Sequence, residues 1–385
     1  MYLYTTIKSE LNGLIHKQIT SLADARVTIN RAAREVWGDV DLNSAKRRAS
    51  SPPNLFTDIY DYSCPADCDT ALIDVSPQVN RSKDSEVSLI NLEEFDRVKG
   101  SWNEIFVAFQ QDSGTRKLKV SMPIDDDTLI ISELDTLSSG GGTWALFGDG
   151  TNLTVDNDNY VRGNGSINWD ISAAGGTTAG IQNATLDLFD IDEFTAAGAV
   201  FVWVYITSAT DITNFILRLG QDSSNYYSKT ITTTNEGTAF TAGWNLLRFD
   251  LQSLSSTGSP AQTDLAYAVL YMTKAVGKIS ETDYRFDWLV LKRGKIYNIW
   301  YYSTYPWQTS ASVWIADSTA DTDYLNAGAD EYKVFLEKCV ELALRELKQK
   351  EEADRYEKSY EGKKNNYKMT HISEAKVVTG TYYNL

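Results

Sequence analysis

The fold of this chain is decided by one apolar-striped stretch near its C-terminus, Asp330-Glu-Tyr-Lys-Val-Phe-Leu-Glu-Lys-Cys-Val-Glu-Leu-Ala-Leu-Arg-Glu-Leu347. Apolar side chains recur there at intervals of three and four residues, which places them on one face of an α-helix. The stripe consists of Tyr332, Phe335, Leu336, Cys339, Val340, Ala343 and Leu347. Because such a face is stable only when it is buried, we expect this helix to form the root of a helical bundle.

The sequence after this stretch changes character. From Lys348 onward it is rich in charged residues, and Gly362 is typical of the residue that follows a helix. The residues that keep the helical spacing are Ala353, Tyr356 and Tyr360. We therefore expect one helix over residues 330–360 with a buried root and a projecting polar end, followed by a tail over residues 363–385. This tail is either a frayed terminus or an arm that docks on another subunit.

Length and composition set the broad class. A chain of 385 residues is long enough for two ordinary domains, and its 10 Trp and 22 Tyr indicate a folded protein with large contact surfaces. The net charge of −16 argues against a general nucleic-acid-binding surface, although a channel that repels DNA could be acidic. No apolar run approaches the roughly twenty residues of a membrane helix, so we expect a soluble protein made in the cytoplasm.

Few residues are available for catalysis or for binding a transition metal. The chain has three Cys and two His, and although Cys64 and Cys68 are close in sequence, a structural zinc site usually takes four such ligands. No nucleophile elbow and no phosphate-binding glycine loop occurs, and the carboxylates are too numerous to single out a catalytic pair. We therefore predict that the protein is not an enzyme and has two ordinary thiols at these cysteines.

Two shorter helices are predicted at the N-terminal end. The first covers residues 6–20. The second follows a capping box at Ser21-Leu-Ala-Asp24, and this helix ends at Gly38. Their short connection predicts an antiparallel pair whose shared groove is open for the C-terminal helix.

A basic triplet, Lys46-Arg47-Arg48, follows these helices. It is either a solvated loop or a contact to an acidic neighbour or to DNA phosphates. Short β-prone runs then continue to residue 121, and Gln110-Gln-Asp-Ser-Gly114 lies between two of them with the composition of a hairpin turn. These runs predict a small antiparallel β unit beside the helices.

Between residues 129 and 293 charge becomes sparse, and Thr, Gly, Asn and Ser become abundant. Strand-like runs recur there, with clear alternation in Phe201, Trp203 and Tyr205, and such spacing without helices is typical of a β-sandwich or jelly roll. The earlier composition returns after Gly294. We therefore predict an α+β multidomain fold. Residues 1–128 and 294–385 form one discontinuous domain, a helical bundle with a short antiparallel β unit, and residues 129–293 are an inserted jelly roll.

The inserted domain resembles the carbohydrate-binding modules of the galactose-binding jelly-roll type. The resemblance rests on Gly163-Asn-Gly-Ser-Ile-Asn-Trp-Asp170, Gly243-Trp-Asn-Leu-Leu-Arg-Phe-Asp-Leu251 and Tyr284-Arg-Phe-Asp-Trp-Leu-Val290. It implies a structural Ca²⁺ held by acidic residues, which here would be Asp149 and Asp287. It also implies glycan binding on aromatic residues, for which the candidates are Tyr226, Tyr227 and Trp244; the alternative is that these aromatic residues belong to the core.

The outer segments resemble the head–tail adaptor, or connector, proteins of tailed bacteriophages. The resemblance rests on Arg31-Ala-Ala-Arg-Glu-Val-Trp37, Tyr301-Tyr-Ser-Thr-Tyr-Pro-Trp307, Asp323-Tyr-Leu325 and the long C-terminal helix, in this order. It implies a ring of twelve subunits in the virion neck, bound to the portal protein above and to tail or nozzle proteins below. Genomic DNA would pass through the lumen without specific binding, and the jelly roll would decorate the outside of the ring as a collar.

The same resemblance implies that the C-terminal arm grips the portal. The candidate docking residues are Lys363, Lys364, Tyr367, Lys368, Tyr382, Tyr383 and Leu385. Minimal adaptors lack the inserted jelly roll, so two further functions stay open. The alternative to an adaptor is a carbohydrate-binding protein that targets a host or environmental polysaccharide, with the helices as its oligomerisation base. The third possible function is that of a glycoside hydrolase.

Overall fold

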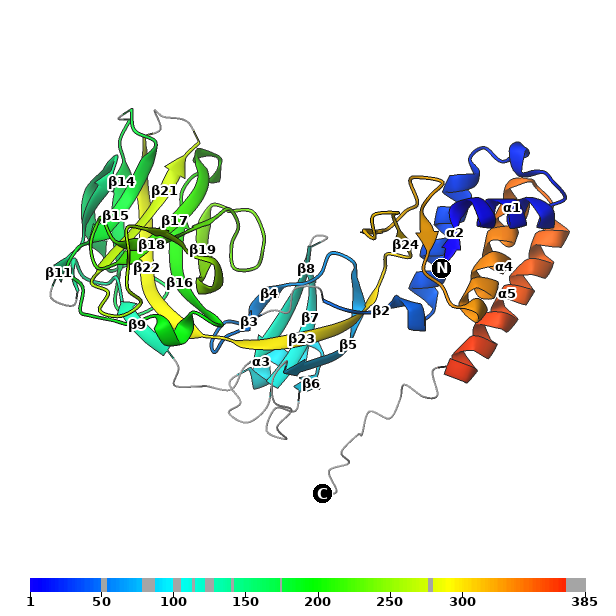
Figure 1. Cartoon of the computed structure of the whole chain (residues 1–385), viewed down its shortest axis with the longest axis horizontal. Helices are drawn as coiled ribbons and strands as arrows, with labels where there is room; N and C mark the ends of the chain where they lie inside the picture. The colour runs from blue at the N-terminus through cyan, green and yellow to red at the C-terminus, as the bar shows by residue number, and fades with distance from the viewer. Residues whose placement is uncertain are drawn as a thin grey trace, which may run out of the picture. The chain divides into compact units, whose positions relative to one another are not determined.

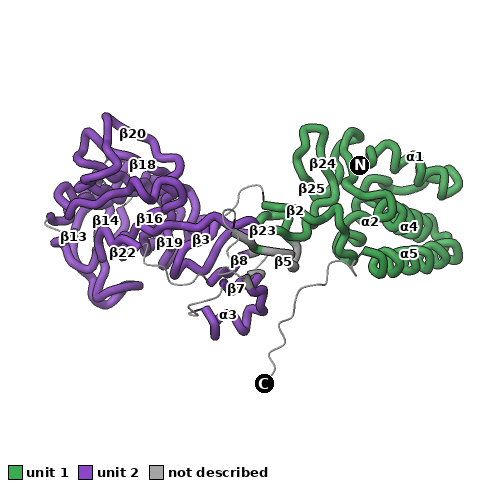
Figure 2. The backbone as a smooth tube through the Cα atoms, turned by 60° about the horizontal axis from the view of Figure 1, so that its bottom comes forward, with its two compact units in different colours: residues 1–50, 65–75, 299–385 green, residues 51–64, 76–298 purple. Residues whose placement is uncertain are grey.

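The computed structural model describes residues 1–49, 54–77, 87–99, 105–112, 115–121, 128–139, 142–173, 175–275 and 280–371. The chain divides into two compact units (Figures 1 and 2). Unit 1 comprises residues 1–50, 65–75 and 299–385, and unit 2 comprises residues 51–64 and 76–298. The predicted α+β class is confirmed by the five α-helices and several antiparallel sheets found among these described residues. No helix among the described residues is long and apolar enough to cross a membrane.

Unit 1 is a helical bundle built from both ends of the chain. Its helices are α1 (Tyr4–Leu14), α2 (Ala25–Asp39), α4 (Ala329–Glu346) and α5 (Lys350–His371). Helix α2 begins where the Asp24 carboxylate accepts a hydrogen bond from the Arg26 backbone N–H at 2.8 Å. The apolar faces of all four helices share one core, in which Ile7, Ile29 and Phe335 are fully buried. The two predicted N-terminal helices and the buried root at residues 330–347 are therefore confirmed. The first helix, however, ends at Leu14 and not at residue 20, because His16 and Lys17 adopt the left-handed conformation, and the second is capped by Asp24 and not by Ser21.

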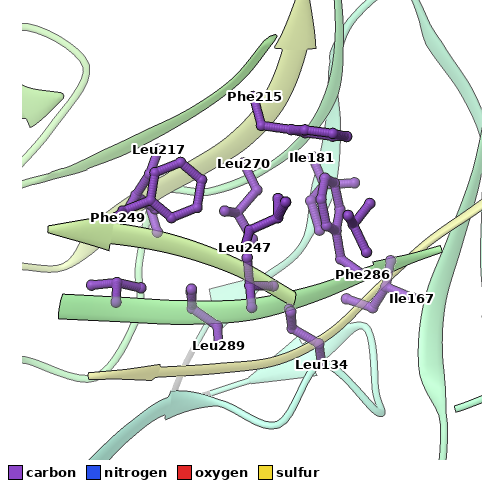
Figure 3. Close-up of a cluster of buried hydrophobic side chains, with 14 of the residues drawn as sticks. Leu134, Ile167, Ile181, Phe215, Leu217, Leu247, Phe249, Leu270, Phe286 and Leu289 are labelled. Atoms are coloured by element: carbon purple, nitrogen blue, oxygen red, sulfur yellow. The ribbon is translucent and has the colours of Figure 1, made fainter. Parts of the chain in front are cut away.

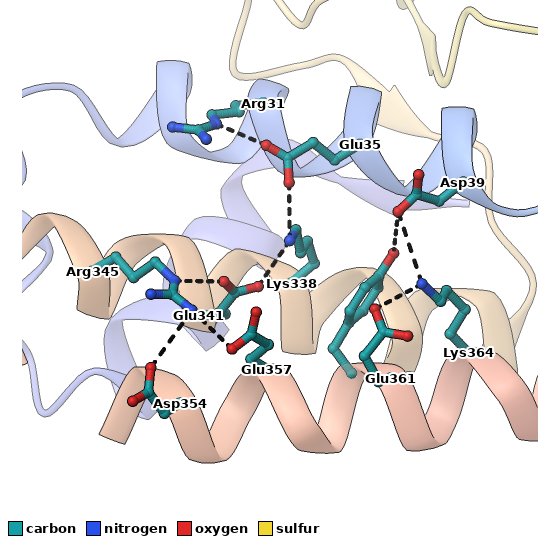
Figure 4. A network of polar contacts seen from close by, with 11 residues as sticks. Arg31, Glu35, Asp39, Lys338, Glu341, Arg345, Asp354, Glu357, Glu361 and Lys364 are labelled. Carbon is teal, nitrogen blue, oxygen red and sulfur yellow. Dashed lines mark hydrogen bonds and ion pairs between the residues drawn. The ribbon is translucent and has the colours of Figure 1, made fainter. Parts of the chain in front are cut away.

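The prediction of one projecting helix over residues 330–360 is wrong. Helix α4 ends at Glu346 because Lys348 adopts the left-handed conformation with a φ of 61°. The N–H groups of Lys348 and Gln349 then donate to the carbonyls of Arg345 and Leu344 at 3.1 and 2.9 Å, which is a Schellman motif. Helix α5 folds back along α4 (Figure 4). Gly362 lies inside α5 instead of ending it.

The short strands of unit 1 join distant segments of the sequence. Strands β1 (Tyr2–Leu3), β26 (Tyr324–Leu325), β24 (Trp307–Gln308) and β25 (Trp314–Ile315) form one antiparallel sheet in that order. Strand β23 (Lys295–Ser303) begins in unit 2, where Lys295 and Ile296 pair with β3 (Asn54–Leu55). It continues into unit 1, where it pairs with β2 (Lys46–Arg48), and β5 (Cys68–Pro77) also pairs with it. The N-terminal residues are thereby fixed beside the segment that leads into α4.

The basic triplet forms strand β2 instead of a loop, and within it Arg48 is exposed whereas Arg47 has partners inside unit 1. The Arg47 side chain is buried, pairs with the Asp67 carboxylate at 2.9 Å, and lies over the Trp314 ring with its guanidinium carbon 3.3 Å from the ring centroid. The Tyr301 hydroxyl donates to the same carboxylate at 2.8 Å. Because the guanidinium is enclosed by these partners, Arg47 holds unit 1 together and is not a surface charge for DNA phosphates.

Unit 2 contains a small sheet of the order β4-β8-β7-β6. Its elements are β4 (Asp61–Ser63), β6 (Val87–Leu89), α3 (Leu92–Val98), β7 (Ile105–Asp112) and β8 (Thr115–Ser121). The predicted hairpin is confirmed by the antiparallel β7–β8 pairing, in which Asp112 lies opposite Thr115. Strand β6 is parallel to β7, so the sheet is not purely antiparallel as predicted.

The predicted jelly-roll region forms a β-sandwich (Figure 1). Sheet I has the order β12 (Ala145–Gly148), β15 (Thr178–Asn183), β21 (Tyr267–Lys274), β17 (Ile212–Gly220), β18 (Tyr226–Ile231) and β20 (Ser255–Thr257). Sheet II has the order β13 (Gly150–Asp156), β14 (Ser166–Ile171), β22 (Glu281–Arg293), β16 (Gly198–Ile206) and β19 (Gly243–Asp250), with β9 (Thr128–Ser132) beside β22. Strands β10 (Ser138–Ser139) and β11 (Gly142–Thr143) form a separate short antiparallel pair.

The sandwich core follows from strand alternation. Val200, Val202 and Val204 of β16 belong to the buried core cluster, which also contains Leu217 of sheet I (Figure 3). Because successive side chains of a strand point to opposite faces, Phe201, Trp203 and Tyr205 lie on the outward face of sheet II. The alternation identified in the sequence is therefore real, and it places three aromatic side chains outside the core.

The predicted boundary at residue 128 differs from the observed division of the chain. The small sheet groups with the sandwich in unit 2 and not with the helices. Its neighbouring segments contact the sandwich directly, because the Phe56 ring packs edge-on against Phe201 at 4.9 Å and Asn235 Nδ2 donates to the Asp61 carbonyl at 2.6 Å. The outer segments of the sequence are thus divided between the two units.

Candidate functional site

The segments that carry the adaptor resemblance meet around one aromatic side chain of unit 1, Phe335. The Trp37 ring of α2 packs edge-on against Phe335 with 6.4 Å between centroids, and the Trp307 ring of β24 does the same at 6.5 Å. Tyr332 lies 6.1 Å from Phe335 on the same helix, and Leu325 is fully buried in the same core. Residues about 300 positions apart in the sequence therefore form a single packed cluster.

A buried carboxylate connects three further segments of unit 1. Glu331 Oε1 accepts hydrogen bonds from the Ser44 N–H at 3.0 Å and the Tyr367 hydroxyl at 2.7 Å, and Oε2 accepts from the Gly328 N–H at 2.6 Å. Burial alone would raise the pKa of Glu331, but these donors favour the ionised form and bring its pKa below the ordinary value. Glu331 therefore fixes both the start of α4 and the last turns of α5.

Charged side chains join helices α2, α4 and α5 (Figure 4). Lys338 Nζ lies 2.9 Å from the carboxylate of Glu35 and 2.9 Å from that of Glu341, so one ammonium bridges α2 and α4. Arg345 pairs with Glu341 at 2.7 Å and with Glu357 of α5 at 3.0 Å. Glu357 of the charged helix α5 is thus matched by a cation of α4, in a pair that stays partly exposed to solvent.

The candidate docking residues fall into two groups. Lys363 pairs with Glu337, and Lys364 lies 2.7 Å from Glu361 and 3.9 Å from Asp39, so both take part in contacts within unit 1. The Tyr367 side chain is 5% exposed and is an anchor of α5 itself, which corrects its assignment to a mobile tail. Lys368 is half-buried near the end of α5. The other candidates, Tyr382, Tyr383 and Leu385, lie outside the described residues.

The structure does not bring the three glycan candidates together. Tyr226 lies on the outward face of sheet I, where the Arg218 guanidinium carbon is 4.7 Å from its ring centroid and 4.9 Å from that of Tyr271. The Tyr227 ring packs against the sandwich core, and its hydroxyl donates to the Pro260 carbonyl at 2.8 Å. An arginine therefore lies against the Tyr226 ring, and the Tyr227 ring packs inward.

Trp244 differs from the two tyrosines. It lies on β19 of sheet II, is half-buried, and packs edge-on against Tyr205 with 5.5 Å between ring centroids. The Arg285 guanidinium carbon lies 4.9 Å from the Tyr205 centroid. All three candidates are half-buried, and Trp244 differs in lying on the outward face of sheet II beside Tyr205.

The two calcium candidates have separate partners. Asp149 pairs with the buried Lys274 ammonium at 2.5 Å, so its charge is already neutralised. Asp287 is fully buried, and its Oδ2 accepts the N–H groups of Val161 and Arg162 at 2.6 and 2.9 Å. Burial raises the pKa of Asp287 to about 6 against these two donors, while its Oδ1 has no hydrogen-bond partner among the described residues.

These environments do not fit one shared Ca²⁺. A calcium ion takes six to eight oxygen ligands, and Asp149 is occupied by an ammonium group. The unpartnered Oδ1 of Asp287 fits a cation ligand by its chemistry, and the charge of Asp135 contributes to its raised pKa. Within the described ranges, no group of three or more His, Cys, Asp or Glu side chains is arranged to hold a metal ion.

Comparisons with known proteins show limited likeness. No protein-family model matches the chain, and no curated protein matches its sequence. Solved structures similar to it include the family 30 carbohydrate-binding module of a cellulosomal cellulase from Clostridium thermocellum, with 12% identity and a TM-score of 0.31 over 43% of this chain and 98% of that chain. A carbohydrate-binding module of the β-sandwich superfamily has 17% identity and a TM-score of 0.29 over 47% and 71%. The Endo-D glycoside hydrolase domain of Streptococcus pneumoniae has 12% identity and a TM-score of 0.27 over 39% and 21%. At these TM-scores the likenesses do not bear on function.

Proposed function

We propose that this chain is a virion structural protein of the head–tail adaptor kind. In this proposal unit 1 is the assembly module that binds the portal protein and joins copies of itself into a ring of twelve, to which tail or nozzle proteins attach. Unit 2 decorates the ring as a collar, and genomic DNA passes through the lumen without specific binding. The site of action is the neck of the virion.

The observation that supports this proposal is the cluster around Phe335. The segments ending at Trp37, Trp307 and Leu325 are far apart in the sequence, so no local structural constraint requires them to occur in one chain. In unit 1 all of them pack with the α4 stripe in one core. Motifs that pack together in the folded chain support the resemblance better than each motif does alone.

The proposal assigns portal docking to residues 372–385, with Tyr382, Tyr383 and Leu385 as anchors. Buried tyrosines commonly dominate the energy of an interface, whereas lysines lie at its polar rim. Truncation after His371 leaves α5 whole, whereas truncation at Gly362 would also remove Tyr367 and destabilise unit 1. The informative truncation therefore ends at His371.

The test is co-assembly with the portal protein of the same virus, measured by co-sedimentation and electron microscopy. The full chain should add a ring of density to the portal, and the chain ending at His371 should fold but fail to co-sediment. The double substitution Tyr382→Ser with Tyr383→Ser should weaken binding by at least about tenfold, since loss of buried anchors costs more than 1.4 kcal/mol. The matched control is Thr379→Ser with Thr381→Ser, which should bind normally. Absence of any complex with the full chain would refute the adaptor assignment.

A further inference from the structure

The outward face of sheet I carries a cluster of aromatic side chains with one arginine, Arg218 of β17, at its centre. The guanidinium carbon lies 4.7 Å from the ring centroid of Tyr226, 4.9 Å from that of Tyr271 and 5.6 Å from that of Phe147. These three rings belong to an apolar cluster that is separate from the sandwich core. They come from β18, β21 and β12, so the cluster extends across five neighbouring strands, or roughly 19 Å.

The two sheets of the sandwich differ in charge. The strands of sheet I, all of which lie within the described residues, contain no Asp or Glu. The strands of sheet II contain six acidic residues: Asp156, Asp170, Asp250, Glu281, Asp283 and Asp287. Sheet I also has Lys229 and Lys274, but these occupy core-side positions of their strands. Arg218 is therefore the one charged residue at an outward position of these strands.

The arginines of sheet II show what Arg218 lacks. Arg248 and Arg285 also lie over aromatic rings, and each pairs with a carboxylate of the same sheet. The distances are 2.8 Å from Arg248 to Asp250 and 2.7 Å from Arg285 to Asp156. Arg218 is half-buried and forms no ion pair with any described residue. Its charge is thus open to a carboxylate from outside the chain, in a protein whose net charge is −16.

Two tyrosine hydroxyls lie beside this guanidinium. Burial raises the pKa of Tyr267 and of Tyr271, and the charge and hydrogen bonding of Arg218 act against that shift. Both phenols are therefore protonated at neutral pH, and no phenolate competes for the arginine. Neutral hydroxyl groups next to a guanidinium add hydrogen-bond donors for a bound carboxylate.

The composition of this face selects among ligand classes. The centres of protein–protein interfaces are enriched in Tyr, Phe and Arg and depleted of Lys, Asp and Glu, and Tyr and Arg are common among the residues that dominate binding energy. The face of sheet I has this composition over a width that suits a protein surface. A symmetric dimer through this face is unfavourable, because each Arg218 would meet a surface that has no acidic residue in its strands.

We propose that the outward face of sheet I is a docking surface for a protein partner that presents an acidic side chain to Arg218. In the complex the carboxylate accepts two hydrogen bonds from the guanidinium, and apolar side chains beside it pack on Tyr226 and Phe147. The proposal concerns unit 2 alone and does not depend on the adaptor assignment.

The test is a selection of random 12-residue peptides on the immobilised full chain, with the Arg218→Gln chain used to remove peptides that bind elsewhere. The enriched peptides should carry an Asp or Glu next to an aromatic or aliphatic residue. Fluorescence polarisation should show binding weakened by at least about tenfold in Arg218→Gln, and equally when the peptide carboxylate is replaced by its amide. The two changes together should cost no more than either alone, since they remove the same contact.

Two further variants serve as controls. Arg218→Lys keeps the charge but not the planar fork of donors, so it should weaken binding severalfold. Arg248→Gln removes an arginine that also lies over a ring, but on sheet II and paired with Asp250, and it should leave peptide binding unchanged.

Hydrogen exchange locates the site without substitutions. A selected peptide should slow exchange in residues 212–231 of the wild-type chain, which keeps the test decisive if Arg218→Gln fails to fold. The proposal is overturned if no peptide distinguishes the wild type from Arg218→Gln, if the enriched peptides lack acidic residues, or if the bound peptide protects β19 of sheet II instead.

Discussion

Helices α4 and α5 lie side by side in unit 1, but they are held there in different ways (Figure 4). Ten of the 18 residues of α4 are buried, whereas three of the 22 residues of α5 are: Ala353, Tyr360 and Tyr367. Helix α4 is thus fixed by an apolar face. Helix α5 is fixed by two tyrosine anchors and by ion pairs to its neighbours.

This difference shows that a strongly charged helix need not project into solvent. Its charges can be matched to those of adjacent helices, as Glu357 is to Arg345 and Lys364 to Asp39. Exposed ion pairs contribute little singly, so the tyrosines must supply most of the free energy that docks α5. The two helices should therefore respond differently to loss of apolar area and to changes of pH.

The largest effect is expected from Phe335→Ala in α4. The ring is fully buried between Trp37 and Trp307, so its removal leaves a cavity and should lower the free energy of unfolding by about 3–5 kcal/mol. Urea denaturation followed by circular dichroism at the helical wavelength measures this. The control Met369→Ala removes a side chain of α5 that is 69% exposed and should change stability by less than about 0.5 kcal/mol. Equal effects of the two substitutions would show that α4 is not held by its apolar face.

The sequence was sufficient to predict α4, because its apolar residues recur with helical spacing on the face that the helix buries. It was insufficient for α5, where Lys348 breaks the helix without the glycine or proline that usually marks such a break. Tyr360 and Tyr367 are seven residues apart, which is the spacing of one helix face. That signal was available, but reading Gly362 as a helix end concealed it.

The candidate sites show the same limit. The alternation of Phe201, Trp203 and Tyr205 was visible in the sequence, and Trp244 was identified as a glycan candidate. Asp58 lines one cavity with Trp203 and Trp244, and the sequence could not group them, because Asp58 lies far earlier in the chain. Packing between residues that are far apart in the sequence produces no local sequence pattern from which it could be predicted.

A second prediction concerns the ammonium that bridges α2 and α4. Lys338→Met keeps the aliphatic stem but leaves Glu341, which is 4% exposed, with Arg345 as its remaining cationic partner. Because an incompletely paired buried carboxylate is unfavourable, we expect a loss of about 2 kcal/mol at neutral pH. Thermal and urea unfolding of the two proteins measure the difference. No loss would indicate that the apolar contacts alone hold α2 on α4.

The same substitution should change the pH dependence. Burial would raise the pKa of Glu35, but hydrogen bonds from Lys338 and Arg31 bring it below its ordinary value. A carboxyl with a lowered pKa in the folded state stabilises the protein above the unfolded pKa of about 4.5 and loses that contribution as the pH falls through the folded pKa. The wild type should therefore lose stability below about pH 4.5 more steeply than Lys338→Met does.

A smaller effect is expected from Tyr367→Phe in α5. This change keeps the buried ring but removes the hydroxyl that donates to Glu331 at 2.7 Å and accepts from the Asn43 N–H at 3.0 Å. Glu331 retains its two backbone donors, so the loss should be about 1–2 kcal/mol. Hydrogen exchange should speed up in the last turns of α5. The control Tyr160→Phe, on an exposed tyrosine of unit 2, should have no effect, and an equal response would exclude a special role for the Tyr367 hydroxyl.

The smallest effect is expected at the break between the two helices, and it has the opposite sign. Lys348 occupies the left-handed position of the Schellman motif, with a φ of 61°, where a side chain with a Cβ is strained and glycine is not. Lys348→Gly should therefore raise the free energy of unfolding by up to about 1 kcal/mol, reduced by the greater freedom of glycine in the unfolded chain. Lys348→Val should lower it, because a β-branched side chain tolerates this conformation least. If Lys348→Gly instead lowered the free energy of unfolding by up to about 1 kcal/mol, as glycine does inside a helix, the chain would not turn at Lys348, and α4 and α5 would be one continuous helix as the sequence pattern first indicated.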